Sequence, residues 1–267
     1  MLLQKVKKWR KKSNVFLELV ASILLFVEHF MQQPTIFDLI SKYKEIKEKD
    51  VQFYLKVQSA LNILIQGLEI YGLNHFVISY NGGKDSDVCA QLWRMAVYLY
   101  LESHGNLGDY MESIENSIFL VFHTPDDFLE IDEHLKKVIS SINVEAVHSN
   151  KNFKEGLKGI IDRYATQAVV LGVRRTDPQG SNLQPQIHST PDYPPFMRIL
   201  PILEWSYGDV WKFIQVFSIP YCILYQQGFV FFFFYFIIDI LLLVQRRILS
   251  RMKHYYKMMV LIFMLLV

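Results

Sequence analysis

Short apolar segments rich in β-branched residues alternate with amphipathic segments of helical periodicity through the middle of the chain. The expected strands are "HFVISY", "SIFLVFHT", "VEAVHS" and "AVVLGV", and a helix-like segment follows each of the first three. A further helix, beginning near Asp50 and stopping at Gly72, precedes the first strand. Parallel neighbouring strands need crossover connections of this length. The order therefore predicts an α/β fold with a doubly wound, mostly parallel sheet and crossover helices.

The 267 residues divide into three parts by composition. Residues 1–49 begin with "MLLQKVKKWRKK", which has six Lys or Arg and no acid, and continue with an apolar stretch interrupted by Glu18 and Glu28. We interpret this part as an N-terminal extension, either a targeting segment or an added amphipathic helix. Residues 50–228 carry the regular alternation and form the expected nucleotide-binding domain.

Residues 229–267 are a Phe-rich apolar tail with a basic patch. Its first apolar run, 229–244, contains Asp239 and is shorter than the roughly 20 residues that span a bilayer. Two interpretations stay open: a marginal membrane anchor, or an aberrant terminus such as a translated intron. Membrane association is expected only through these terminal apolar segments.

Charge and cysteine content exclude several classes of function. The formal net charge is +2, which gives no global field for nucleic acid, and we expect no nucleic-acid partner. The two cysteines, Cys89 and Cys222, lie far apart without a partner at metal-binding spacing. This argues against a disulfide scaffold, a zinc site and a CxxC redox motif, and it fits a reducing compartment. We expect a cytoplasmic protein, with membrane-associated or mitochondrial placement as alternatives.

The loop "YNGGKDSD" follows the first expected strand and leads into a helix. Gly82 and Gly83 allow a tight turn whose N–H groups can form an anion-binding nest, and the helix N-terminus adds partial positive charge. Lys84 contributes a full charge, and Asn81 and Ser86 offer hydrogen bonds. A simple turn, with Asp85 or Ser86 capping the helix, is the competing interpretation.

A second polar group, "RRTDP", follows the strand "AVVLGV". Paired arginines can hold a phosphate in a fork geometry, and Asp177 can accept a hydrogen bond from a ring N–H. A solvated arginine pair beside a turn explains the same residues equally well. The long polar loop 174–196 that begins here is either functional or irregular.

The motifs together resemble a known family. "SYNGGKDS" is similar to the SxGGKDS loop of the PP-loop ATP pyrophosphatases. "LGVRRTDP", "PPFMRILPILEWSYGDVWKFI" and "IPYCILYQQGF" resemble the eukaryotic-type FAD synthases of the PAPS-reductase-like group, in that family's order. The resemblance extends from about Asp50 to Phe229, and beyond that point the chain departs from the family pattern.

The resemblance implies an FMN adenylyltransferase that joins the AMP part of ATP to FMN, with Mg²⁺ neutralising the phosphates. It implies catalytic roles for Asn81, Lys84, Asp85 and Arg175, with Asp85 also a possible Mg²⁺ ligand. It assigns ATP binding to Ser79, Tyr80, Gly82, Gly83 and Ser86, and flavin or flavin-phosphate binding to Arg174, Asp177 and Arg198, beside Arg175. Trp205, Asp209 and Trp211 are interpreted as core and helix-cap residues.

Two other functions stay open. The loss of the family pattern after residue 228 leaves a catalytically impaired ATP- or flavin-binding protein as the alternative. A PAPS or APS reductase is disfavoured, because neither Cys89 nor Cys222 lies in the exposed, electropositive setting that a reactive thiolate needs. His123, at the end of the second expected strand, is where this superfamily would place a partner for adenosine. A lone histidine there is more often a surface residue, so we assign it no role from the sequence.

Overall fold

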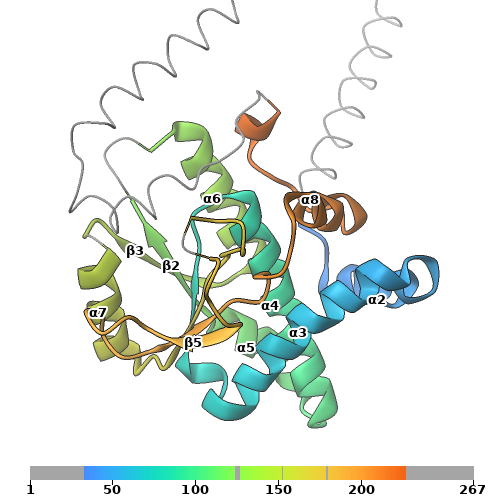
Figure 1. Ribbon diagram of the computed structural model, residues 1–267. Coiled ribbons are helices and arrows are strands. Elements are labelled where there is room, and N and C mark those ends of the chain that lie inside the picture. The colour runs from blue at the N-terminus through green and yellow to red at the C-terminus, as the bar shows by residue number, and fades with distance from the viewer. Residues whose placement is uncertain (1–32, 124–126, 152, 179, 227–267) are drawn as a thin grey trace, which may run out of the picture.

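A computed structural model describes residues 33–123, 127–151, 153–178 and 180–226. Its centre is a six-stranded sheet in the order β3-β2-β1-β4-β6-β5 (Figure 1). All neighbouring strands pair in parallel except β5 and β6, which are antiparallel. The strands are β1 Phe76–Ser79, β2 Ile118–Phe122, β3 Glu145–Ser149, β4 Ala168–Val170, β5 Gln186–His188 and β6 Met197–Ile199. The predicted α/β class with a mostly parallel sheet is confirmed.

Helices cover both faces of the sheet. They are α2 Ile36–Lys49, α3 Val51–Tyr71, α4 Lys84–Ser103, α5 Tyr110–Glu115, α6 Leu129–Ile142, α7 Phe153–Tyr164 and α8 Tyr207–Val216. Three short 3-10 segments are η1 Leu73–His75, η2 Leu107–Asp109 and η3 Ile223–Tyr225. Figure 1 shows α7 on the opposite side of the sheet from α2 and α3.

Successive strand side chains enter two separate cores, which is why the strands read as continuous apolar runs. In β1, Phe76 and Ile78 join the core under α3 and α4, whereas Val77 faces the core under α7. A strand buried on both faces has no polar side to show in its sequence. The alternation of helices and strands along the chain therefore predicts this fold better than an alternating polar and apolar pattern within each strand.

Helix α8 begins with a side-chain cap. Ser206 is its N-cap, and Ser206 and Asp209 form a reciprocal capping box. Trp205 is buried and packs against Phe53 and Phe213, and Trp211 packs edge-on against tyrosines near the end of the described chain. Asp209 also pairs with Lys56 of α3, so the core and cap interpretation of these three residues agrees with their contacts.

Four elements of the structure were not predicted from the sequence: α2, α5, β5 and β6. Residues 36–49, inside the expected extension, form α2, whose Leu39 and Ile40 are buried in the core shared with α3 and α4. The loop 174–196 contains β5, an edge strand of three residues. The domain boundary at residue 50 stays a prediction.

The basic and apolar part of the N-terminal extension and the Phe-rich tail lie outside the described residues. Among the helices that the structure does describe, none is both long and apolar enough to cross a membrane.

Candidate functional site

The glycine loop joins β1 to α4 at the carboxyl edge of the parallel strands, where ligands bind in open α/β sheets. Helix α4 begins at Lys84, four residues before the expected helical segment, with Gly83 as its N-cap. Neither Asp85 nor Ser86 is therefore the cap. The side-chain oxygen of Asn81 instead accepts hydrogen bonds from the Gly83 N–H at 3.0 Å and the Ser86 hydroxyl at 2.8 Å. These contacts fix the loop from within.

Two glycines close to the loop leave little room for a side chain. Gly82 has φ +70°, a conformation that favours glycine, and a Cβ there would lie 3.2 Å from atoms of Ile131 and Leu135 on α6. Gly172, just after β4, lies so close to the start of α4 that a Cβ would stand 3.1 Å from the Asp85 carbonyl carbon. This close approach brings the "RRTDP" group beside the glycine loop.

We expect Gly82→Ala to destabilise the fold more than Gly105→Ala. Both residues have nearly the same positive φ, +70° and +72°, so both substitutions carry a backbone cost of about 1–2 kcal/mol. Only Gly82 has side chains within 4 Å of its Cβ position. Urea unfolding of both variants measures the difference, and equal losses of unfolding free energy would contradict a packing contribution from α6.

Four buried charged residues meet beside the loop. The Lys84 ammonium lies 2.7 Å from Asp85 Oδ2, and the Arg174 Nε lies 3.1 Å from Asp85 Oδ1. Asp177 accepts a hydrogen bond from the Arg174 N–H at 2.7 Å and faces its guanidinium at 3.3 Å. Burial raises the pKa of the Asp177 carboxyl, although the hydrogen bond from the Arg174 N–H and the charge of Arg174 oppose the rise. Two sequence-distant motifs thus form one cationic and carboxylate cluster.

Two tyrosines cover this cluster. The Lys84 ammonium lies 5.3 Å from the ring centre of Tyr207 and 5.7 Å from that of Tyr225. The Tyr225 hydroxyl also accepts a hydrogen bond of 2.9 Å from the Lys84 backbone N–H. A phosphate that uses this N–H must therefore displace the Tyr225 hydroxyl.

Tyr80, Asp87 and His134 form a buried hydrogen-bonded triad next to the glycine loop. The Tyr80 hydroxyl donates to Asp87 Oδ1 at 2.5 Å, and His134 Nε2 of α6 lies 2.9 Å from Asp87 Oδ2. The Tyr80 side chain is consequently directed into the protein, so any contact with ATP would come from its backbone. His134 could not be predicted from the sequence, because nothing in its own helix marks it as the partner of a residue 47 positions away.

The His134 pair predicts a pH-dependent stability. Burial disfavours the charged imidazole, but the charge and hydrogen bond of Asp87 outweigh it and raise the His134 pKa above its ordinary value. A raised folded-state pKa means that the stabilisation is complete below the unfolded pKa of about 6.5 and is lost as pH rises through the folded value. Urea unfolding between pH 5.5 and 8.5 should show this decline in wild type and not in His134→Gln; parallel curves would contradict it.

Two predicted binding arginines lie outside the charged cluster in the described contacts. Arg175 pairs with Glu204 and donates to the backbone carbonyls of Ser181 and Leu183. Arg198 of β6 donates to the His188 carbonyl at 2.8 Å. Both side chains therefore donate hydrogen bonds to backbone carbonyls of the segment 174–196, which connects β4 to β6. Their roles, like that of Ser79 at the end of β1, stay predictions.

The residues around Asp85 do not fit a magnesium site in this arrangement. Mg²⁺ prefers carboxylate and phosphate oxygens as ligands. Both oxygens of Asp85 face cationic side chains, Lys84 on one side and Arg174 on the other. Metal binding by Asp85 would require one of these contacts to break.

Both cysteines are buried. Burial raises the pKa of the Cys89 thiol in α4, and burial likewise raises that of Cys222. A thiolate nucleophile needs the opposite environment, exposed and electropositive. The described structure thus gives neither cysteine the properties of a reductase nucleophile.

Comparison with known proteins agrees with the motifs. The family model for the phosphoadenosine phosphosulfate reductase domain matches residues 75–232. A probable FAD synthase of Caenorhabditis briggsae is 30% identical over 72% of this chain and 36% of its own length, so the chain spans about a third of that relative. A probable FAD synthase of Schizosaccharomyces pombe is 28% identical over 68% of this chain and 67% of its own.

Among solved structures, the FMN adenylyltransferase of Candida glabrata aligns with a TM-score of 0.63 at 21% identity, covering 75% of this chain and 71% of that one. At that identity the likeness shows the fold. The family match covers more than half of the chain and includes both strand-end motifs. The chain therefore belongs to the phosphoadenosine phosphosulfate reductase domain family, as a member that resembles the eukaryotic FAD synthases.

Proposed function

We propose that the protein is an FMN adenylyltransferase, which forms FAD and pyrophosphate from ATP and FMN. The observation that carries the proposal is the meeting of the glycine loop with the "RRTDP" group, in a chain whose curated relatives are named FAD synthases. The solved Candida glabrata enzyme was crystallised with FMN and an ATP analogue, which supports the same pair of substrates here.

The proposed reaction needs no covalent nucleophile. A phosphate oxygen of FMN attacks the α-phosphorus of ATP in line, the bond to the β-phosphate oxygen breaks, and pyrophosphate leaves with the electron pair. Lys84 and the N–H groups at the start of α4 would stabilise the charge on the departing pyrophosphate. Arg174 and Asp177 would orient the flavin or its phosphate, and Arg175 and Arg198 would extend that side of the site. Positioning and charge stabilisation are the main sources of rate in such transfers.

The test is incubation of purified full-length protein with ATP, Mg²⁺ and FMN, with separate measurement of FAD and pyrophosphate. Mg²⁺ is included because polyphosphate oxygens bind it. Equal amounts of the two products, lost in Lys84→Ala and Arg175→Ala, support the proposal. ATP consumption without FAD, or FAD formed equally well by both variants, would contradict it.

A second candidate is an ATP- or flavin-binding protein without turnover. It is favoured by one observation: the Tyr225 hydroxyl already occupies the Lys84 N–H, at the point where the described chain ends. Binding of ATP and FMN in calorimetry, with no FAD formed over hours, would identify this case. Reductase chemistry is disfavoured by the two buried cysteines. The absence of a nucleic-acid partner and a cytoplasmic location stay predictions.

A further inference from the structure

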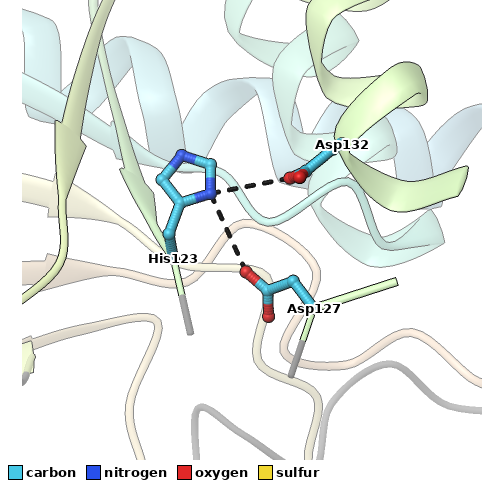
Figure 2. A group of neighbouring side chains, drawn as sticks. All are labelled: His123, Asp127 and Asp132. Atoms are coloured by element: carbon cyan, nitrogen blue, oxygen red, sulfur yellow. Dashed lines mark ion pairs between the residues drawn. The ribbon is translucent and has the colours of Figure 1, made fainter. Parts of the chain in front are cut away.

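A second group of potential ligands lies at the same edge of the sheet as the glycine loop. His123 directly follows β2, Asp127 precedes α6, and Asp132 lies in the first turns of that helix (Figure 2). Each is partly buried, with side-chain exposures of 28%, 22% and 33%. None of the three belongs to the cluster of Lys84, Asp85, Arg174 and Asp177.

The three side chains converge on one point. Figure 2 shows both carboxylates directed at the same ring nitrogen of His123. His123 Nδ1 lies 3.8 Å from Asp127 Oδ2 and 3.6 Å from Asp132 Oδ1, and one donor atom from each residue lies within 4.8 Å of the others. These separations exceed a hydrogen bond. The two distances from His123 Nδ1 to the carboxylate oxygens are close to the spacing of about 3–3.6 Å expected between two ligand atoms bound to one metal at about 2.0–2.2 Å.

The Asp132 carboxylate has an oxygen that the protein leaves unsatisfied. Within the described residues, Asp132 Oδ1 is shielded from solvent and has no hydrogen-bond partner. A buried carboxylate oxygen without a partner is costly, and native structures seldom retain one. The same oxygen faces the His123 ring nitrogen, so a bound cation would satisfy it.

His148 of β3 fixes the orientation of the His123 ring. Its Nδ1 lies 2.6 Å from His123 Nε2, and the two rings stack with centroids 4.9 Å apart. A hydrogen bond between two ring nitrogens requires one donor and one acceptor. If His123 Nε2 donates, its Nδ1 is left with a lone pair directed at the carboxylates. Histidine ligands of metals are commonly held through their second nitrogen in this way.

We propose that His123, Asp127 and Asp132 form a binding site for a divalent transition-metal ion such as Zn²⁺. One imidazole nitrogen and two carboxylate oxygens are suitable Zn²⁺ donors. Three protein ligands leave at least one coordination position for water or an external ligand, as in open zinc sites. The site shares no residue with the cluster of Lys84, Asp85, Arg174 and Asp177.

The test uses two titrations of the full-length, metal-stripped protein without nucleotide. Binding of Zn²⁺ is measured by isothermal titration calorimetry, and binding of Co²⁺ is measured by visible absorption. Wild type should bind one ion at this site, and Co²⁺ should give an absorption spectrum that Zn²⁺ abolishes. Asp132→Asn and His123→Gln should each weaken binding at least tenfold. Glu133→Gln, an exposed neighbour on α6, is the matched control and should bind as wild type does.

Thermal unfolding of each variant separates a lost site from a lost fold. Asp132→Asn is the decisive variant, because it keeps the size of the side chain and removes only the charge. Wild type that binds neither ion would overturn the proposal. Equal Zn²⁺ binding by wild type, Asp132→Asn and His123→Gln would also overturn it, since the ion would then be held elsewhere.

Discussion

Replacing Lys84 by alanine is expected to lower kcat/KM for FAD formation about 10²–10³-fold, the loss typical of removing one preorganised charge or donor from a developing anion. Lys84 is 1% exposed and begins α4, directly after the glycine loop. Steady-state rates with ATP, Mg²⁺ and FMN measure the effect.

Two controls separate chemistry from folding in that experiment. Lys158→Ala removes an exposed lysine of α7 and should leave the rate unchanged. Because Lys84→Ala also removes a partner of buried Asp85, its unfolding free energy should be measured alongside. A folded Lys84→Ala protein with a rate within twofold of wild type would show that Lys84 does not carry the transfer.

Arg174→Met is expected to destabilise the fold by about 3–5 kcal/mol, because removing one partner of a buried ionic cluster leaves uncompensated charge. Arg174 is 3% exposed and faces Asp85 and Asp177 at once. Urea unfolding at neutral pH measures the loss. The adjacent Arg175 is the natural comparison: it is partly exposed and paired with the exposed Glu204, so Arg175→Ala should have a much smaller effect on stability.

A second substitution tests whether the cluster itself is the cause. In the Arg174→Met background, Asp177→Asn removes one of the two orphaned carboxylates and should restore part of the lost stability. The double-mutant cycle then gives a coupling energy between the two residues. Additive losses, or equal losses for Arg174→Met and Arg175→Ala, would mean that the buried cluster does not stabilise the fold.

Much of the fold was predictable because its signals are local. Strand and helix periodicity, the Ser206 cap and the glycine pair each depend on residues within a few positions. Helix α2 and strand β5 were missed for the opposite reason. A helix that packs on α3 and α4, and an edge strand of three residues that pairs with β6, are stabilised by partners that no local pattern reveals.

The candidate site divides in the same way. The sequence alone predicted which loops reach the ligand edge, because the glycine loop and "RRTDP" each directly follow an expected parallel strand. The partners of these residues follow from the three-dimensional packing: Arg174 pairs with Asp85, Arg175 pairs with Glu204, and His134 contacts Asp87. Adjacent residues after a strand point in different directions, and their partners are chosen by packing across the sheet rather than by neighbours in the chain.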